Sequence, residues 1–267
     1  MPCMTWVRDL LHDDWPDRLR RRGLPTGLQD LDALTGGITS PSLWLLIGTP
    51  GVGRTTLACQ LAFSAALSGP NTVTVLSGQH QPSALLANML CAHGKVPAQH
   101  LFIGELDADE RRRLHDSMGI VSGTSLRLLS THDRAWQHDH STSVPDLNLI
   151  VGGHRPPARL FVVEDADLLL DRPLEQALPA LRAWCHQAGF ALLLTAPEEP
   201  LLMDGHAHPA VRRQTDVLLR LTREDQFDPH SSRAGEADLH VITHRGGPTA
   251  KIRLAFQGHY RRFVDLP

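Results

Sequence analysis

Residues 48–56 read GTPGVGRTT, and an apolar run, LWLLI at residues 43–47, leads directly into them. The stretch fits the pattern G-x-x-x-x-G-K-[ST] at every defined position except one, where Arg54 replaces the lysine. That pattern is typical of a loop that binds the phosphate groups of a nucleotide. Good helix formers follow at residues 57–67, so the loop has the strand before it and the helix after it that the motif requires. The stretch predicts an α/β fold built around a phosphate-binding loop.

The predicted loop combines three features that bind phosphate. Its glycines let backbone N–H groups approach phosphate oxygens without a side chain in the way. The start of the following helix adds a partial positive charge, and Thr55 supplies the hydroxyl that ligates Mg²⁺ in such loops. We therefore expect ATP or another nucleoside triphosphate, with Mg²⁺, as the cofactors. The expected cofactor-binding residues are Gly48, Pro50, Gly51, Gly53, Arg54, Thr55 and Thr56.

Arg54 is the departure from the motif. Arginine keeps the positive charge of lysine, but its planar fork is bulkier and the exchange is not neutral. The fork can still hold phosphate oxygens through two hydrogen bonds. Lysine occurs only at positions 95 and 251, so a general preference for arginine is an alternative explanation. We expect nucleotide binding to survive in weakened form, with hydrolysis slow or absent.

The composition is that of an ordinary globular chain. The 267 residues are 42% hydrophobic and 21% charged, with a net charge of −3, which is enough for one large α/β domain. This balance argues against a surface coated with positive charge, although a local basic lining stays open. Four scattered cysteines without a C-x-x-C spacing are typical of reduced thiols, so we expect a cytoplasmic protein. No apolar run is long enough to span a bilayer, and we expect no membrane partner.

The remaining chain alternates predicted strands and helices. Apolar runs predict strands at residues 43–47, 72–76, 126–129, 160–163 and 191–194, and helices lie between them, including residues 83–92, 108–118 and 174–187. This alternation predicts a mainly parallel sheet with helices on both faces. After residue 215 the runs at 217–222, 239–243 and 252–256 predict an antiparallel C-terminal extension. Residues 141–145 and 228–235 are predicted to be loops.

Residues 1–22 differ from the rest of the chain. Trp6, Val7, Leu10 and Leu11 fall on one face of a short helix, and an arginine-rich stretch follows. We predict a linker-like helix at residues 1–22 ahead of a single domain at residues 23–267. The helix either packs on its own domain or docks as an arm on a neighbouring subunit.

Three stretches together carry a family resemblance. They are GLPTGLQDLDALTGG at residues 23–37, the loop at residues 48–56, and HRGGPTAKIRLAFQGHYRRFVDL at residues 244–266. From about residue 23 onward, the chain resembles the C-terminal motor domain of DnaB-type replicative helicases, within the RecA-like ATPases. The resemblance implies a RecA-like P-loop core, a homo-oligomer such as a hexameric ring with nucleotide between subunits, and single-stranded DNA and replication proteins as partners. In place of the family's N-terminal primase-interacting domain we expect only the linker-like helix.

The resemblance aligns Gln79, in the segment SGQH at residues 77–80, with a catalytic glutamate of the family. A glutamine cannot accept a proton, and loss of a general base lowers a rate roughly 100- to 10,000-fold. Gln79 could still orient the attacking water, as glutamine does in some GTPases. The alternative is a surface turn residue without a role.

Three further catalytic positions come from the resemblance. The stretch LFVVEDADLLL at residues 160–170 aligns Glu164 with the family aspartate that holds the water bound to Mg²⁺, and Asp165 could serve instead or could cap a helix. Thr55 and Glu164 are thus the expected metal-binding pair. Arg245 matches an arginine that the family presents to the γ-phosphate bound by a neighbouring subunit. It could instead be a turn residue beside two glycines.

Two other family positions are replaced. Ala196, after Thr195, stands where the family has a polar sensor of the γ-phosphate, and Thr243 stands where it has a lysine. The DNA-gripping loops of the family are short here, and Arg212 and Arg213 are the candidate DNA-binding residues. These two arginines could equally be solvated side chains that flank a strand.

Three functions stay open from the sequence. The first is a nucleotide-binding, ring- or filament-forming relative of DnaB-type helicases whose hydrolysis is impaired. The second is an active ATP-dependent helicase or translocase on single-stranded DNA, and the third is a RecA-like recombination or signalling ATPase. The closely spaced histidines at residues 138–140 and 206–208 lack the further ligands of a metal site, so we expect no structural metal.

Overall fold

The computed structural model describes residues 23–131, 158–203 and 206–266. The predicted linker-like helix at residues 1–22, the predicted loop at residues 141–145 and the histidines at residues 138–140 lie outside the described residues. All structural statements below concern the described part of the chain.

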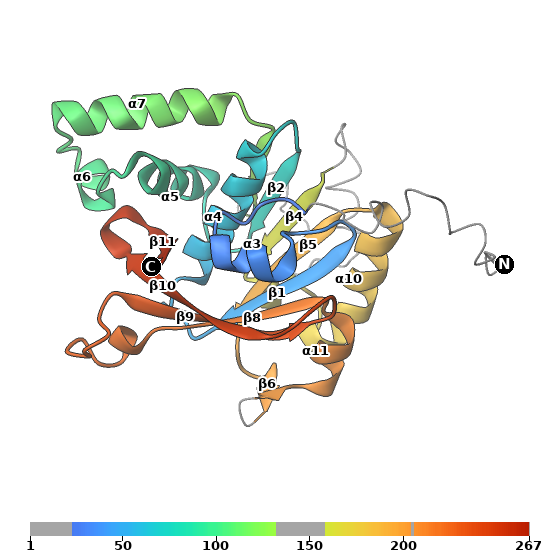
Figure 1. The fold of residues 1–267 in the computed structure, drawn as a ribbon. Coiled ribbons are helices and arrows are strands. Elements are labelled where there is room, and N and C mark those ends of the chain that lie inside the picture. The colour runs from blue at the N-terminus through green and yellow to red at the C-terminus, as the bar shows by residue number, and fades with distance from the viewer. Residues whose placement is uncertain (1–22, 132–157, 204–205, 267) are drawn as a thin grey trace.

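A nine-stranded sheet forms the centre of the structure (Figure 1). Its strand order is β11-β10-β9-β8-β1-β5-β4-β2-β3. The strands are β1 (Ser42–Gly48), β2 (Val73–Ser77), β3 (Leu126–Ser130), β4 (Leu160–Glu164), β5 (Ala191–Pro197), β8 (Val217–Thr222), β9 (Glu236–His244), β10 (Ala250–Gln257) and β11 (Arg262–Asp265). A separate two-stranded ribbon joins β6 (Leu202–Met203) to β7 (His206–Ala207).

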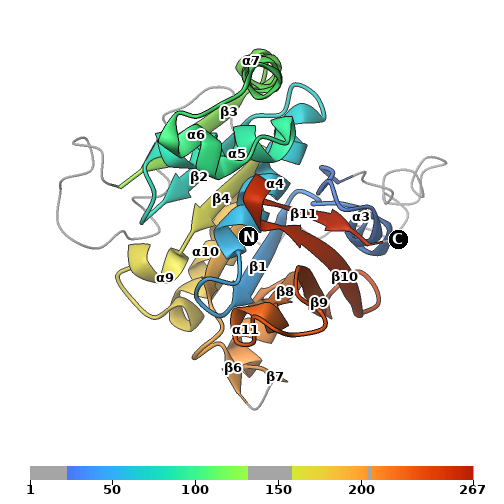
Figure 2. The ribbon, with the colours of Figure 1, turned by 90° about the vertical axis from the view of Figure 1, so that its left-hand side faces the viewer.

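The sheet is parallel over one part and antiparallel over the other. Strands β8, β1, β5, β4, β2 and β3 run parallel to one another, whereas β8/β9, β9/β10 and β10/β11 are antiparallel pairs. In Figure 2 the antiparallel strands lie on the side of β1 opposite to β2 and β3. The predicted sheet with an antiparallel C-terminal extension is confirmed. Strand β8 belongs to both parts, because it pairs antiparallel with β9 and parallel with β1.

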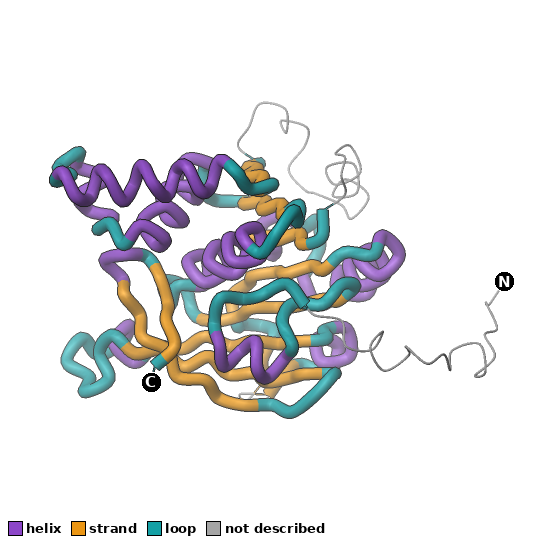
Figure 3. Tube along the Cα trace, turned by 45° about the horizontal axis from the view of Figure 1, so that its top comes forward, coloured by secondary structure: helices purple, strands orange, loops and turns teal. Residues whose placement is uncertain are grey.

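Helices cover both faces of the sheet (Figure 3). Alternate residues of β1 explain the two layers: Trp44 and Leu46 belong to the core cluster that includes α4 (Arg54–Leu67), whereas Leu43, Leu45 and Ile47 belong to the cluster that includes α10 (Leu174–Ala188). All seven residues of β1 are buried. A strand buried on both faces needs a continuous apolar run, which is what the sequence provides.

The remaining helices lie around this frame. They are α3 (Gln29–Thr35), α5 (Pro82–Gly94), α6 (Ala98–Ile103), α7 (Ala108–Ser122), α9 (Ala166–Leu169) and α11 (Pro209–Gln214), with the 3₁₀ turns η2 (Glu224–Gln226) and η3 (Gly258–Tyr260). Helix α7 begins at a capping box, in which Asp107 accepts a hydrogen bond from the backbone N–H of Glu110 and the Glu110 carboxylate accepts one in return. Within the described residues, no helix is both long enough and apolar enough to cross a membrane.

Candidate nucleotide-binding site

The predicted phosphate-binding loop connects β1 to α4. Gly51 and Gly53 have φ values of +80° and +109°, a region that only glycine adopts without strain. A Cβ atom on Gly53 would lie 2.8 Å from Cζ of the buried Phe263, and one on Gly48 would lie 2.6 Å from the carbonyl oxygen of Leu221. The glycines are therefore required by the packing of this loop against the antiparallel part of the sheet.

Glu164 is the centre of a polar cluster at the carboxyl ends of β4 and β2. Its side chain is fully buried, and one carboxylate oxygen accepts a hydrogen bond from the Thr55 hydroxyl at 2.5 Å. The other oxygen accepts a hydrogen bond from the Ser77 hydroxyl and lies 3.2 Å from Nδ1 of His80. The predicted pair of Thr55 and Glu164 is thus in direct contact. A hydroxyl and a carboxylate at the mouth of the loop form an oxygen donor set that suits Mg²⁺ shared with phosphates.

The two adjacent carboxylates have opposite pKa shifts. Burial by itself would raise the pKa of Glu164, but the hydrogen bonds from Ser77 and Thr55 and the nearby His80 outweigh burial and lower it. Burial and the neighbouring Glu164 carboxylate raise the pKa of Asp165 to about 6, although Arg54 opposes them. Glu164 is therefore the carboxylate that stays ionised over the wider pH range.

The guanidinium of Arg54 contacts both the loop and Asp165. Its Nη1 donates to the carbonyl oxygen of Gly48 at 2.6 Å, and its Nη2 lies 3.0 Å from Oδ1 of Asp165. Both side chains are nearly buried, with 11% and 7% of their surfaces exposed. Asp165 itself has φ of +50°, and its backbone N–H donates to the Thr195 hydroxyl at 2.8 Å. Asp165 is thus held where it pairs with Arg54, while Glu164 alone contacts Thr55.

The side chains at the positions aligned with the catalytic glutamate and the sensor form no hydrogen bonds within the described residues. Gln79 is exposed, and within the described residues its side-chain amide has no hydrogen-bond partner, although its backbone N–H donates to the Ser77 hydroxyl. Ala196 is buried and its side chain offers no polar atom. The hydroxyl of Thr195 is engaged by the backbone of Asp165.

Arg245 lies far from the loop of its own chain. Its Nε is 2.9 Å from Oδ1 of Asp216, and its Nη2 donates to the carbonyl oxygen of Arg213 at 2.8 Å. Asp216 is hydrogen-bonded to Leu43, at the amino end of β1, whereas the loop follows the carboxyl end at Gly48. Five residue steps of a strand separate the two ends by roughly 17 Å. The structure does not bring Arg245 to the other predicted site residues within one chain.

Arg212 and Arg213 lie in the last turn of α11. Pro209 at the first helical position and the hydrogen bond from the Ala210 N–H to His208 Nδ1 start this short helix, which the sequence analysis did not predict. Both arginines are exposed. They line an open cavity of about 560 Å³ together with Thr243 and Arg245. The hydroxyl oxygen of Thr243 is buried without a hydrogen-bond partner among the described residues.

Thr56, the last predicted loop residue, faces a different cavity. It is buried and lines a space of about 290 Å³ with Cys59 and Gln60 of α4 and Phe263 of β11. The described residues contain no group of three or more histidine, cysteine, aspartate or glutamate side chains that could hold a metal ion.

Sequence reasoning missed two side chains of the Glu164 cluster, Ser77 and His80. Both lie in the segment that was aligned for Gln79, but their contact with Glu164 depends on β2 pairing with β4, which sets Ser77 opposite Glu164. Strand order depends on contacts between distant parts of the chain and cannot be predicted from a local stretch of sequence. The local signal for the contact was that each of the two apolar runs ends in a polar residue.

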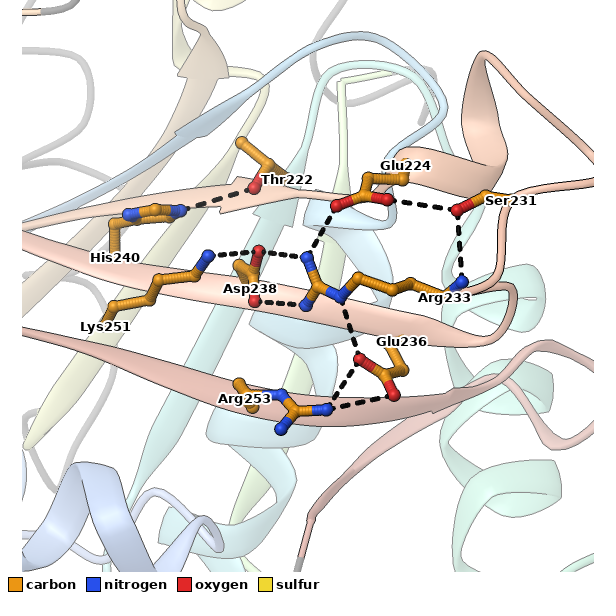
Figure 4. A network of polar contacts seen from close by, with 9 residues as sticks. All are labelled: Thr222, Glu224, Ser231, Arg233, Glu236, Asp238, His240, Lys251 and Arg253. Carbon is orange, nitrogen blue, oxygen red and sulfur yellow. Dashed lines mark hydrogen bonds and ion pairs between the residues drawn. The ribbon is translucent and has the colours of Figure 1, made fainter.

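A network of charges fixes the segment between β8 and β9 (Figure 4). Arg233 is its centre and forms ion pairs with Glu224, Glu236 and Asp238 at 2.7, 3.0 and 2.7 Å. Lys251 of β10 adds a second cation 2.7 Å from Asp238. The network ties η2, which carries Glu224, to strands β9 and β10.

The pH dependence of stability tests this network. Burial alone would raise the pKa of Asp238, but the hydrogen bonds from Arg233 and Lys251 lower it to about 2 from its usual 3.8. Because the folded-state pKa is lowered, the contribution to stability is present above about pH 4 and is lost as the pH falls from 4 towards 2. We expect Asp238→Asn to lower the free energy of unfolding by about 2 kcal/mol at pH 7, measured by urea denaturation.

Asp109→Asn is the matched control, since Asp109 pairs with Arg112 while 65% and 68% of the two side chains are exposed. That change should alter stability by less than about 0.5 kcal/mol. A deficit of Asp238→Asn that stays the same at pH 7 and pH 3 would contradict the assignment.

The loop, the carboxylates at the strand ends and the sheet order together define a P-loop domain of the RecA-like fold. The predicted resemblance to a DnaB-type helicase C-terminal domain is confirmed: residues 23–138 match the family described as "DnaB-like helicase C terminal domain". The prediction of a RecA-like α/β fold is confirmed with it.

Curated relatives share the sequence over most of the chain. The "Replicative DNA helicase DnaB" of Leifsonia xyli subsp. xyli is 29% identical over 265 residues, which cover 91% of this chain and 56% of the relative. The protein of the same name from Geobacillus stearothermophilus is 24% identical over 261 residues, which cover 91% of this chain and 57% of the relative. The chain therefore spans only somewhat more than half the length of these relatives.

Two solved structures share the fold. One, described as an "ATPase Domain", superposes with a TM-score of 0.83 at 16% identity, covering 99% of this chain and all of that one. A structure titled "The Structure Of A DnaB-Like Replicative Helicase And Its Interactions With Primase" gives a TM-score of 0.80 at 18% identity, covering 92% of this chain and 62% of that one.

Proposed function

We propose that this chain binds a nucleoside triphosphate with Mg²⁺ at the loop of residues 48–56 and hydrolyses it slowly, as a subunit of a ring or filament. The contact between Thr55 and Glu164 carries the proposal. It joins a hydroxyl of the loop to a fully buried carboxylate with a lowered pKa. When bound, Mg²⁺ would supply the positive charge that offsets the charge of the phosphates.

The backbone of the loop supports phosphate binding. The first N–H groups of an α-helix have no partner within the helix, and α4 begins at Arg54, directly after Gly53. These donors and the partial positive charge of the helix suit a phosphate group. Thr55 and Glu164 would hold the metal, and the loop amides would hold the phosphates.

Slow hydrolysis follows from the side chains around the loop. Gln79 cannot accept a proton from the attacking water. Arg54 would have to give up its contact with Asp165 before both arms of its fork could hold phosphate. Ala196 adds no side-chain hydrogen bond. These three side chains support a pocket in which nucleotide binding is retained and hydrolysis is slow.

The position of Arg245 supports assembly of several copies. Since it lies near the amino end of β1 and the loop follows the carboxyl end, it could act only on a nucleotide held by another subunit. Its ion pair with Asp216 would have to open for that contact. Large apolar side chains exposed on α6 and α7, namely Phe102, Ile103, Met118 and Ile120, offer surface for a neighbouring subunit.

The second candidate is an active DNA helicase or translocase. The names of the relatives favour it, since those proteins are called replicative DNA helicases. The exposed pair Arg212 and Arg213 offers cations for a DNA backbone. Turnover of ATP measured with and without single-stranded DNA, with oligomer mass recorded on the same sample, separates the two candidates. Strong stimulation by DNA would favour the helicase.

The Mg²⁺-dependent part of nucleotide affinity tests the binding proposal. We expect Thr55→Ala to weaken the binding of a fluorescent ATP analogue about tenfold in the presence of Mg²⁺ and by much less in EDTA, because the change removes a metal ligand. Thr249→Ala, in an exposed loop, is the matched control and should leave both affinities unchanged. Equal affinities of wild type and Thr55→Ala with Mg²⁺ would contradict the proposed metal site, and no measurable binding by wild type would overturn the function.

A further inference from the structure

The turn η2, which follows β8, lies directly against the phosphate-binding loop. Gln226 of η2 accepts a hydrogen bond from the Thr49 hydroxyl at 2.8 Å through Oε1. Its Nε2 donates to the carbonyl oxygen of Pro50 and lies 3.4 Å from where a Cβ of Gly51 would be. One side-chain amide therefore bonds to two consecutive loop residues from a segment about 175 positions later in the chain.

Arg223, just before η2, contacts the next part of the loop. Its Nη1 donates to the carbonyl oxygen of Val52 at 3.4 Å. The guanidinium is held in place by two partners, since it lies 3.8 Å above the ring centre of Phe256 and forms an ion pair with Asp225 at 3.0 Å. The Phe256 ring in turn packs against Phe263, which faces Gly53. The contacts thus continue to the end of the loop.

The chemistry of these contacts leaves the phosphate donors free. Gln226 and Arg223 donate to backbone carbonyl groups of Pro50 and Val52, and the Gln226 oxygen is taken by a threonine hydroxyl. Neither side chain uses a backbone N–H of the loop. Because phosphate groups bind to those N–H groups, the two side chains fix the loop without competing with a ligand.

The Arg233 network (Figure 4) anchors η2, the turn that carries Gln226. Glu224, at the start of η2, is paired with Arg233, which is also bound to Glu236 and Asp238 of β9. Asp225 accepts a hydrogen bond from the backbone N–H of Gly235 at 3.0 Å, just before β9 begins. Both ends of the segment are therefore attached to the antiparallel part of the sheet.

We propose that Gln226 is a positioning residue for nucleotide binding, which holds the loop in its phosphate-binding shape before the ligand arrives, with Arg223 as its partner. This inference rests on the proposed function, because it assigns a role in nucleotide binding at the same loop. A loop that is ordered in advance loses less conformational entropy when the ligand binds, and affinity rises accordingly. The antiparallel extension thereby acts on the site through the outer, carbonyl side of the loop.

The experiment is a titration of Gln226 variants with a fluorescent ATP analogue and Mg²⁺. We expect Gln226→Ala to raise Kd about three- to tenfold, the change that one or two net hydrogen bonds produce. Gln226→Glu should bind more weakly still, since it keeps the acceptor for Thr49 but turns a carboxylate oxygen towards the Pro50 carbonyl. The melting temperature should change little for Gln226→Ala, because the half-buried side chain lies outside both hydrophobic core clusters.

Phe227→Glu is the control for charge. Phe227 is 74% exposed and adjacent to Gln226, so this variant adds a negative charge at nearly the same place without touching the loop. It should alter Kd less than twofold at physiological salt, where exposed charges are screened. If Phe227→Glu weakens binding as much as Gln226→Glu, the glutamate effect is electrostatic and the inference loses that support.

Hydrogen exchange of the nucleotide-free protein separates the inference from the proposed function. The amides of residues 49–55 should exchange faster in Gln226→Ala than in wild type, with the exchange of β4 and α10 unchanged. Unaltered exchange and unaltered Kd in a chain that binds nucleotide would overturn the positioning role alone. Faster exchange in a chain that binds no nucleotide would overturn the proposed function and leave Gln226 as a purely structural contact.

Discussion

Replacing Arg54 with lysine and Gln79 with glutamate in the same chain is expected to raise the rate of ATP hydrolysis by about 100-fold or more. A glutamate at position 79 restores a group that can accept the proton of the attacking water, and such a base contributes roughly 100- to 10,000-fold to a rate. Gln79 is exposed and its side chain is free of hydrogen bonds within the described residues. The new carboxylate therefore enters without a burial penalty, and phosphate release under steady-state conditions measures the gain.

The control combines Arg54→Lys with Gln81→Glu. Gln81 is exposed two residues further on, so the control makes the same chemical change outside the aligned position and should gain little. Wild-type turnover in the range of common enzymes, about 10 per second, would show that hydrolysis is not impaired. An unchanged rate in the double variant that still binds nucleotide would mean that position 79 does not face the ligand.

Gly53→Ala is expected to lower the free energy of unfolding by about 2 to 4 kcal/mol and to weaken nucleotide binding by at least tenfold. The backbone at Gly53 has φ of +109°, which costs a residue with a Cβ about 1 to 3 kcal/mol. The added Cβ would also lie 2.8 Å from Cζ of Phe263, whose ring is buried and cannot move freely. Urea denaturation and titration with the fluorescent ATP analogue measure the two effects.

Gly119→Ala makes the matched comparison. Gly119 lies within α7, its backbone is not in the left-handed region, and a Cβ there would meet nothing within 4 Å. Because alanine favours a helix by about 1 kcal/mol over glycine, this variant should be slightly more stable than wild type and should bind nucleotide equally well. If Gly53→Ala is as stable as wild type, the ring of Phe263 yields more readily than the packing indicates.

Most of the parallel sheet could be predicted because its signals are local. Each of β1, β2, β4 and β5 has five to seven mostly apolar residues and is buried along its whole length or nearly so. Such runs need only the sequence window to be recognised. The direction of β8 relative to its neighbours could not be predicted this way. It pairs with β1 on one side and β9 on the other, and its own sequence does not show which of these pairs is parallel.

The short elements escaped prediction for a related reason. The helix α11 has six residues and the ribbon of β6 and β7 has two residues in each strand. Segments of this length carry too few residues for a periodic pattern and are stabilised by their surroundings. As a result, the helix that carries Arg212 and Arg213 was not predicted.

The sequence by itself determined the unit of strand, glycine-rich loop and helix, because the glycine spacing, the preceding strand and the following helix all lie within 25 residues. Tertiary structure alone decided which carboxylate contacts Thr55 and which partners the Arg54 guanidinium binds. It also decided how far Arg245 lies from the loop. It also decided that Gln226 and Arg223 reach the loop. The physical reason is the distance along the chain over which each interaction acts. The backbone conformation at a glycine is set by neighbouring atoms, whereas these side-chain contacts depend on the order in which nine strands pair.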